Sequence, residues 1–359
     1  MPASLSVRDL VLRRPLRTAT GTVAIRRVWI LSIGDGSGLV GLGEAAPLQD
    51  FGGELIPACE KALKTALPLL TDEFVHGWLD RARADAPLGQ LERVLAQTPC
   101  ARSAVEGALL DLLAQLGGTP LAELLSPSYT PFLPVNALAD AGIGQMSSAL
   151  QAIASGYRTI KIKASADPAE TSNALIKLRG QVGPEVALRV DANAAWNGDQ
   201  AVRFAEATRL VDLEYLEQPL PVGDLQGMAA LRLRTGMKIA VDESVRTPAD
   251  VGRVGAAQAA DIVVLKPAFL GGWRPIKQAA QLARTCGLEV VVTTAMDSAV
   301  GRAHATHIAA ALGLEHRAQG LSTGELLVAD STSEPLKPSA GDIAIHARPG
   351  LGIGELIPG

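Results

Sequence analysis

The sequence predicts an α/β protein in which an α+β first third is followed by a closed (β/α) barrel. After Pro131, short β-branched runs alternate with alanine-rich helical segments, a pattern typical of parallel strands joined by helical crossovers. Charged residues end successive runs at steps of 26, 25 and 24 residues, from Asp191 to Glu217, Asp242 and Lys266. Each step is close to one strand plus one helix, so the units repeat as a barrel requires.

The first third mixes strand and helix signals. Residues 28–48, "VWILSIGDGSGLVGLGEAAPL", carry Asp-Gly and Ser-Gly turns between apolar runs, which predicts an antiparallel hairpin or meander. Apolar residues then recur every three or four positions over residues 54–70 and 99–118, as in helices that bury one face. Gly117 and Gly118 end the second pattern, because glycine favours helix termination.

The barrel strands are expected where β-branched residues cluster between helical stretches. These runs can be continuously apolar, because helices cover a parallel sheet. The C-terminal residues 331–359 are rich in Gly and Pro and are expected to pack with the first third. The expected strands are residues 133–139, 158–164, 186–192, 213–219, 238–244, 261–267 and 288–294.

Composition narrows the classes of function. The formal net charge is −4 and 48% of the residues are hydrophobic, which disfavours a nucleic-acid or membrane partner. No apolar run approaches the roughly 20 residues of a spanning helix, and charges interrupt the N-terminus, so no secretion signal is expected. Cys59, Cys100 and Cys286 form no CxxC pair, which favours reduced thiols and a cytoplasmic protein. A homo-oligomer is compatible with the sequence.

Charged residues fall at the carboxyl ends of consecutive expected strands. Parallel strands bring these ends to one rim, where (β/α) barrels place their active sites. Carboxylates gathered there need a cation, and oxygen ligands without Cys or His select Mg²⁺ or Mn²⁺. Acidic strand ends can instead cap a helix, and a lysine can simply be solvated, but the shared register favours one site. The residues are Lys163, Asp191, Glu217, Asp242 and Lys266.

Neighbouring residues are expected to support this site. Asn193 and Glu243 extend the polar strand ends, and Arg189 shares the face of Asp191 and is expected to pair with carboxylates inside the barrel. A small carboxylate substrate bound to the ion would lose the proton on the adjacent carbon more easily, because the cation lowers the cost of an enediolate. Lys163 would act as the base, and Lys161 as the charge that tunes it.

These residues resemble the enolase superfamily in its muconate-lactonizing-enzyme-like branch. Members of that branch carry a KxK on the second strand, metal carboxylates on the third, fourth and fifth strands, and a lysine on the sixth. The resemblance implies a modified (β/α)7β TIM-type barrel over residues 129–324. It also implies an α+β capping domain over residues 1–128, completed by residues 325–359, with Lys163 and Lys266 as catalytic residues.

Peripheral stretches favour one activity among the two-lysine members of the branch. Residues 43–54 and 319–330, "QGLSTGELLVAD", resemble o-succinylbenzoate synthases. Dipeptide epimerases usually carry a DxD on the eighth strand, and the corresponding stretch here, "GLSTGELL", has no aspartate pair. The main prediction is dehydration of 2-succinyl-6-hydroxy-2,4-cyclohexadiene-1-carboxylate to o-succinylbenzoate, in menaquinone biosynthesis. An N-acylamino acid racemase or dipeptide epimerase is the alternative, and cycloisomerisation is a fourth activity of the branch. A non-catalytic acid-binding barrel fits the five retained charges poorly.

The predicted mechanism gives each lysine a separate part. By the resemblance, Lys163 takes the α-proton and then protonates the departing hydroxyl on the same face, while Lys266 stabilises the enediolate from the opposite face. Thr20, in a small polar stretch, and Asp297 and Ser298, after the seventh strand, are expected to contact the substrate. The histidines of "GRAHATHIAAAL" are expected to pack rather than bind metal.

Overall fold

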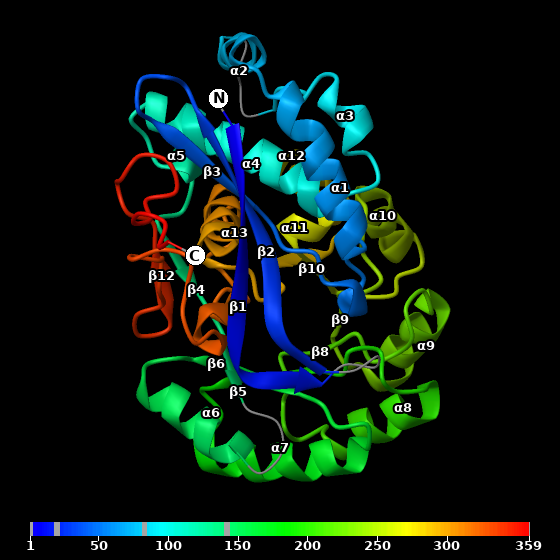
Figure 1. Ribbon diagram of the computed structural model, residues 1–359. Coiled ribbons are helices and arrows are strands. Elements are labelled where there is room, and N and C mark those ends of the chain that lie inside the picture. Colours follow the sequence, from blue (N-terminus) through cyan, green and yellow to red (C-terminus); the bar gives the residue numbers. More distant parts are fainter. Residues whose placement is uncertain (1–2, 18–21, 81–84, 140–143, 359) are drawn as a thin grey trace.

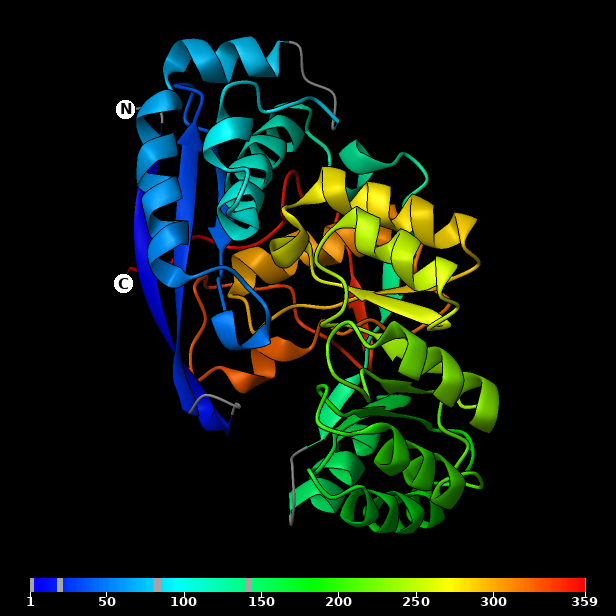
Figure 2. The same cartoon turned by 90° about the vertical axis from the view of Figure 1, so that its right-hand side faces the viewer.

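The computed structural model describes residues 3–17, 22–80, 85–139 and 144–358. A capping domain of sheet and helices packs against a barrel of strands and helices (Figures 1 and 2). This architecture confirms the predicted α/β fold class with a capping domain. Thr20, one of the expected substrate contacts, lies outside the described residues.

An antiparallel sheet forms one layer of the capping domain. In the described residues its strands are β1 (Ala3–Arg17), β2 (Thr22–Gly34) and β3 (Val40–Ala45), ordered β1-β2-β3. Between β2 and β3, the carboxylate of Asp35 accepts hydrogen bonds from the backbone N–H and the hydroxyl of Ser37, at 2.9 and 2.6 Å. These bonds close the predicted turn, because an aspartate side chain can replace a backbone acceptor there.

Helix α4 (Pro99–Leu116) lies directly on β3, and two glycines permit the close approach. A Cβ on Gly41 or Gly43 would overlap the α4 backbone at Ala108 or Ala104. The remaining capping helices are α1 (Ile56–Ala66), α2 (Asp72–Leu79), α3 (Leu91–Val94) and α5 (Leu121–Leu125), with the 3-10 turns η1 (Gln49–Phe51) and η2 (Leu67–Leu69).

A parallel sheet forms the barrel wall, and over the described part of the chain its order is β11-β10-β9-β8-β7-β6-β5. Gln319 and Gly320 close it: Gln319 bridges Val135 before β5, and Gly320 bridges Thr293 after β11. The strands are β5 (Ala137–Ala139), β6 (Thr159–Lys163), β7 (Ala187–Asp191), β8 (Tyr215–Glu217), β9 (Ile239–Val241), β10 (Ile262–Leu265) and β11 (Glu289–Val292).

Helices alternate with these strands, and local caps define their ends. Asn197 and Gln200 exchange side-chain-to-backbone bonds in a capping box that starts α8, and left-handed Gly236 ends α9. The helices are α6 (Gln145–Ala154), α7 (Pro168–Val182), α8 (Gly198–Ala207), α9 (Leu225–Thr235), α10 (Pro248–Ala256), α11 (Pro267–Leu270), α12 (Trp273–Thr285) and α13 (Ala299–Ala311), followed by the 3-10 turn η4 (Thr323–Leu326).

The C-terminal segment returns to the capping domain, as Figure 1 shows in orange and red. Strand β12 (Asp342–Ala344) pairs antiparallel with β4 (Phe132–Pro134). Further along, the backbone N–H of Leu351 donates to the buried carboxylate of Asp111 on α4, at 2.8 Å. The segment therefore contacts both β4 and the capping helix α4, while the predicted division of the chain into domains stays a prediction.

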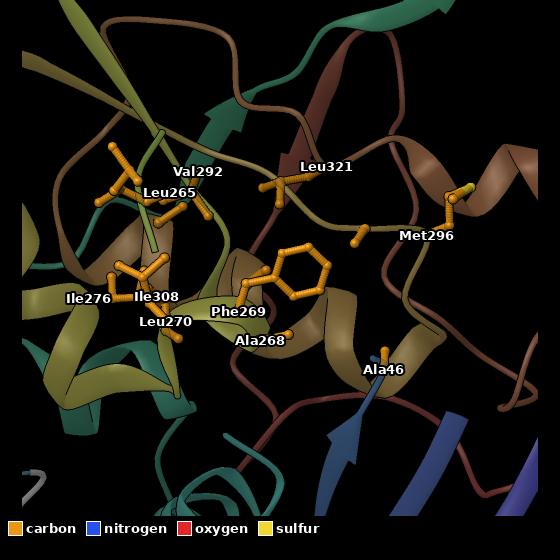
Figure 3. Close-up of a cluster of buried hydrophobic side chains, with 14 of the residues drawn as sticks. Ala46, Leu265, Ala268, Phe269, Leu270, Ile276, Val292, Met296, Ile308 and Leu321 are labelled. Carbon is orange, nitrogen blue, oxygen red and sulfur yellow. The ribbon is translucent and has the colours of Figure 1, made fainter. Parts of the chain in front are cut away.

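Buried apolar side chains connect the barrel to its cap. Figure 3 shows Ala268, Phe269 and Leu270 of α11 in one such cluster, with Leu265 and Val292 from the barrel strands. Ala46, which directly follows β3, belongs to the same core. Among the described residues, no helix is both long and apolar enough to cross a membrane.

Candidate active site

The predicted charges meet at the carboxyl ends of adjacent strands. Lys163 is in register with Asp191, and Asp191 with Glu217, across β6, β7 and β8. Asp242 directly follows β9, and Lys266 directly follows β10. Parallel strands in register place these ends at one level of the barrel, so the structure brings all five residues to one rim.

Lys161 lies at the centre of the carboxylates. Its Nζ is 2.9 Å from Oδ2 of Asp191 and 2.6 Å from Oε2 of Glu217. Burial lowers the pKa of Lys161, but the charges of Asp191 and Glu217 outweigh burial and hold that pKa well above its ordinary value. Lys161 therefore stays a cation, and its charge makes two buried carboxylates tolerable.

Lys163 points to the same carboxylates from a more open position. Its Nζ donates to Oδ2 of Asp191 at 2.6 Å and to Oδ1 of Asn193 at 2.8 Å, and its side chain is 33% exposed. Asn193 in turn donates to Oε1 of Glu243 at 3.0 Å. Asn193 and Glu243 thus form a hydrogen-bonded chain that orients the Lys163 ammonium group toward the rim.

Lys266 approaches the carboxylates from the other side. Its ammonium group contacts both carboxylate oxygens of Asp242, and its side chain is buried. In the sheet order, β7, β8 and β9 lie between the strand of Lys163 and the strand that precedes Lys266. The two lysines therefore flank the carboxylates from opposite sides.

The electrostatics of the carboxylates favour one more cation. Burial raises the pKa of Asp191, but the charges of Lys161 and Lys163 outweigh burial and leave that pKa below its ordinary value. Burial and the charge of Asp191 raise the pKa of Glu217 to about 8, even beside Lys161. A buried carboxylate that resists ionisation has too little positive charge around it. A divalent cation would supply that charge.

The donor atoms fit a hard metal ion. In the described part of the chain, no group of three His, Cys, Asp or Glu side chains stands arranged to hold a metal ion, and lysine ammonium groups contact the carboxylate oxygens instead. Oxygens are nevertheless available: Oε2 of Glu243 is buried and accepts no hydrogen bond from a described residue. Carboxylate oxygens without thiolate or imidazole are the ligands that Mg²⁺ prefers.

Family comparisons agree with this geometry. Residues 3–126 match the family Mandelate racemase / muconate lactonizing enzyme, N-terminal domain, and residues 145–354 match Enolase C-terminal domain-like. The chain belongs to the enolase superfamily. Both matches fall in its mandelate racemase and muconate lactonizing enzyme group, which confirms the resemblance of the sequence motifs.

Relatives in the superfamily carry different activities. An o-succinylbenzoate synthase of Thermobifida fusca is 39% identical over 217 residues, covering 60% of this chain and 67% of that protein. An L-Lys-D/L-Arg epimerase of Methylococcus capsulatus is 30% identical over 360 aligned positions, covering 95% of both chains. An L-Ala-D/L-Glu epimerase of Bacillus subtilis is 31% identical, covering 95% of this chain and 93% of its own.

Solved structures of the superfamily share the whole fold. The dipeptide epimerase of Methylococcus capsulatus, complexed with Mg and the dipeptide L-Arg-D-Lys, superimposes with a TM-score of 0.88 at 28% identity, covering 98% of this chain and 99% of its own. The substrate-liganded L-Ala-D/L-Glu epimerase of Bacillus subtilis gives a TM-score of 0.83 at 27% identity, covering 99% and 98%. A related fold therefore holds Mg and a small substrate.

Arg189 lies inside the barrel, below this enolase-type rim. It is fully buried, and its guanidinium donates to Oε2 of Glu214 at 2.5 Å and to the carbonyl of Ala318 at 2.7 Å. The same group stacks over the ring of Tyr215, 4.7 Å from its centroid. Arg189 therefore pairs with a carboxylate inside the barrel and links β7 to the segment that closes it.

Asp297 and Ser298, which follow β11, are both buried. Ser298 is fully buried, and its hydroxyl donates to the carboxylate of Glu44 on β3. Asp297 is 2% exposed, and its Oδ1 accepts from the backbone N–H of Ala295 at 3.2 Å. The substrate contact expected for both residues stays a prediction, since the proposed metal carboxylates at the rim are buried to the same degree.

The histidines of α13 have packing roles. Nε2 of His304 lies 2.7 Å from the carbonyl of Leu42 on β3. Nδ1 of His307 accepts from the backbone N–H of Ala122, at 3.0 Å, so its Nε2–H donates to the carbonyl of Leu351, at 3.1 Å. These bonds tie a barrel helix to the cap.

Sequence reasoning missed Glu44 and Arg246. Glu44 caps α13 from the capping domain, and Arg246 binds the backbone of residues 51 and 52. Their partners lie about 200 residues or more away in the chain, and no periodic pattern marks such a pair. Glu44 could have been noticed from the sequence only as a charged residue in an otherwise apolar, strand-like run.

Proposed function

We propose that this protein is a Mg²⁺-dependent enzyme that removes the proton from the carbon next to a substrate carboxylate. The observation that carries the proposal is the pair of lysines, Lys163 and Lys266, on opposite sides of buried carboxylates. Such a pair can reach both faces of a planar enediolate. Asp191, Glu217 and Asp242 would hold the ion.

The chain's own residues perform the proton transfers. Neutral Lys163 would take the α-proton, and its hydrogen bond to Asn193 keeps its amine aimed at the rim. Lys161 keeps a positive charge below the substrate throughout, because Asp191 and Glu217 bind it. Bound Mg²⁺ would offset the second negative charge that forms on the substrate carboxylate when the proton leaves.

Racemisation or epimerisation is the first candidate for the overall reaction. The epimerase relatives of Methylococcus capsulatus and Bacillus subtilis match over 95% of the chain, whereas the synthases of Thermobifida fusca and Mycolicibacterium smegmatis match over 60% and 67% of it. Lys163 would take the proton from one face, and protonated Lys266 would return one to the other face. The eighth-strand stretch "GLSTGELL" lacks an aspartate pair for an ammonium group. This favours an N-acylated amino acid over a dipeptide.

Dehydration to o-succinylbenzoate is the second candidate. Identity to the synthases of Thermobifida fusca and Mycolicibacterium smegmatis is 39% and 36% over their matched segments, which exceeds the 30% identity to the L-Lys-D/L-Arg epimerase over nearly the whole chain. Lys163 would then take the α-proton and return it to the departing hydroxyl on the same face, so water leaves and the ring becomes aromatic. Lys266 would remain a cation beside the enediolate.

One substrate panel tests the proposal and separates the candidates. Proton exchange at Cα in D₂O is followed by NMR with N-succinylamino acids and dipeptides, and loss of the diene absorbance is followed with the cyclohexadiene substrate. We expect Mg²⁺-dependent turnover of at least one class, absent with EDTA. In Lys163→Ala, dehydration, or proton exchange of the enantiomer that Lys163 deprotonates, should be lost. The proposal fails if wild-type protein with Mg²⁺ neither exchanges nor dehydrates any of them.

A further inference from the structure

Arg246 joins the capping domain to the barrel rim. Its guanidinium donates to the carbonyls of Phe51 and Gly52 in the cap, at 2.7 and 3.1 Å. It also donates to the carbonyls of Asp242 and Val245 in the barrel, at 3.1 and 2.8 Å. One side chain therefore connects the backbone of a capping loop to the backbone at a candidate metal ligand.

The loop is shaped to receive this side chain. We define the capping loop as residues 46–53, between β3 and α1. It contains η1, after which Gly52 adopts φ +78°, and the N–H groups of Phe51 and Gly53 both donate to the carbonyl of Leu48. A Cβ on Gly52 would lie 2.5 Å from the Arg246 guanidinium. Glycine therefore permits both the turn and the close approach of Arg246.

A second arginine holds the other end of the capping loop. Arg26 on β2 is buried and donates to the carbonyls of Ala46 and Pro47, at 2.9 and 2.8 Å. Arg26 belongs to the same domain as the loop, so it fixes the loop within the cap. Arg246 instead comes from the barrel, so it sets where the loop lies relative to the rim.

The backbone of Arg246 is held in place close to the residues of the rim. Its backbone N–H donates to Oδ2 of Asp250 at 2.9 Å, and Asp250 also caps the start of α10. Its guanidinium lies 4.0 Å from Oδ1 of Asp242 and 5.7 Å from the ring centroid of Phe269. Nζ of Lys266 lies 5.8 Å from the same ring. Arg246 therefore fixes the position of the capping loop relative to both Asp242, a proposed metal ligand, and Lys266.

We propose that Arg246 is a positioning residue that holds the capping loop against the barrel rim and thereby sets which substrate side groups are accepted. The proposal rests on the proposed function for its substrate and extends it to specificity. Because the guanidinium donates its hydrogen bonds to backbone carbonyls of the loop and the rim, and not to the amines of Lys163 or Lys266, its removal should weaken substrate binding more than it slows the proton transfer.

Arg246→Ala is compared with wild type and with Arg234→Ala, a control whose exposed side chain pairs only at 3.5 Å with Glu206. We expect KM to rise about tenfold or more, as loss of charge-assisted hydrogen bonds implies, with kcat changed less. Added guanidinium ion should lower the raised KM of Arg246→Ala and leave the control unchanged. Arg246→Lys lacks the planar guanidinium fork, so its KM should rise as in Arg246→Ala, but added guanidinium ion should not lower it. Arg246→Lys takes the place of Arg246→Ala in the comparison if Arg246→Ala does not fold.

Amide hydrogen exchange reads the loop without any substrate. The N–H groups of residues 51–53 should exchange faster in Arg246→Ala than in wild type and the control. Unchanged exchange, or unchanged KM for every substrate, overturns the proposal. A wild-type protein that transfers no α-proton would overturn the proposed function instead. In that case, amide exchange of residues 51–53 that is as slow in Arg246→Ala as in wild type would still refute the positioning role.

Discussion

Glu44 of the capping domain caps a barrel helix through Ser298. Its Oε1 accepts the backbone N–H of Ser298 at 2.8 Å, and its Oε2 accepts the N–H of Gly301 at 3.0 Å and the Ser298 hydroxyl. Burial and the charge of Asp297 raise the pKa of Glu44 to about 7, against the opposing effect of these hydrogen bonds. The interface between cap and barrel therefore contains a carboxylate that titrates near neutral pH.

Glu44 should make stability fall as pH rises. Its folded pKa of about 7 exceeds the ordinary value of 4.5, so the contribution is fully present below pH 4.5 and is lost as pH rises through 7. The loss is about 3 kcal/mol at most. Urea unfolding at pH 5 and pH 8 measures it. Glu44→Gln, whatever its own stability, should lose this slope, and an unchanged slope would refute the assignment.

His307 should act in the opposite direction. Burial lowers its pKa to about 4, below the ordinary 6.5, so its contribution is present above pH 6.5 and is lost as pH falls through 4. Protonation would remove the ring nitrogen that accepts from Ala122. We expect a loss of about 2 kcal/mol between pH 7.5 and pH 5. In His307→Gln the free energy of unfolding, measured by urea titration, should fall less between pH 7.5 and pH 5 than in wild type. An equal fall in the two proteins would contradict this.

The positions of the rim residues were predictable because they depend on local repeats. Lys163, Asp191 and Glu217 each end a short apolar run, and in-register parallel strands then must align them. Asp297 and Ser298 also follow a strand, and sequence reasoning assigned them to the substrate for the same reason. Ser298 instead donates to Glu44, 254 residues away in the chain, and no local rule contains that contact.

The closure of the barrel also depends on contacts that the local sequence pattern did not predict. The alternation of runs predicted parallel strands, but the eighth strand is represented by bridges at Gln319 and Gly320 rather than by a long apolar run. Gln319 is fully buried, and its Oε1 accepts the backbone N–H of Val292 at 2.7 Å. A polar residue that closes the sheet through its side chain gives no hydrophobic periodicity to detect.

Magnesium should stabilise the folded protein through the rim carboxylates. Under the proposed function, Mg²⁺ binds the native rim and not the unfolded chain, so the melting temperature should rise with the Mg²⁺ concentration. Glu217→Gln removes a buried, proposed ligand and should abolish most of that rise, whereas Glu206→Gln, which changes an exposed carboxylate on α8, should keep it. Scanning calorimetry with and without EDTA measures the shift. An equal rise in both variants would place the metal elsewhere.

The two lysines give a test that separates the candidate reactions by stereochemistry. In a racemase, Lys163→Ala should lose α-proton exchange for one enantiomer while Lys266→Ala loses it for the other, each by at least about 100-fold, the usual contribution of a general base. In the synthase, Lys163→Ala should lose dehydration because the same amine takes and returns the proton, and Lys266→Ala should slow it by removing a charge.

Exchange of each separated enantiomer in D₂O, followed by NMR, distinguishes these outcomes, with Lys177→Ala, an exposed lysine on α7, as the control. Equal loss of both enantiomers in each variant would contradict a two-base racemase. The structure makes the stereochemical result direct, because Lys163 binds Asp191 from the β6 side and Lys266 binds Asp242 from the β10 side. A substrate held between them exposes opposite faces to the two amines, so each amine can serve one enantiomer.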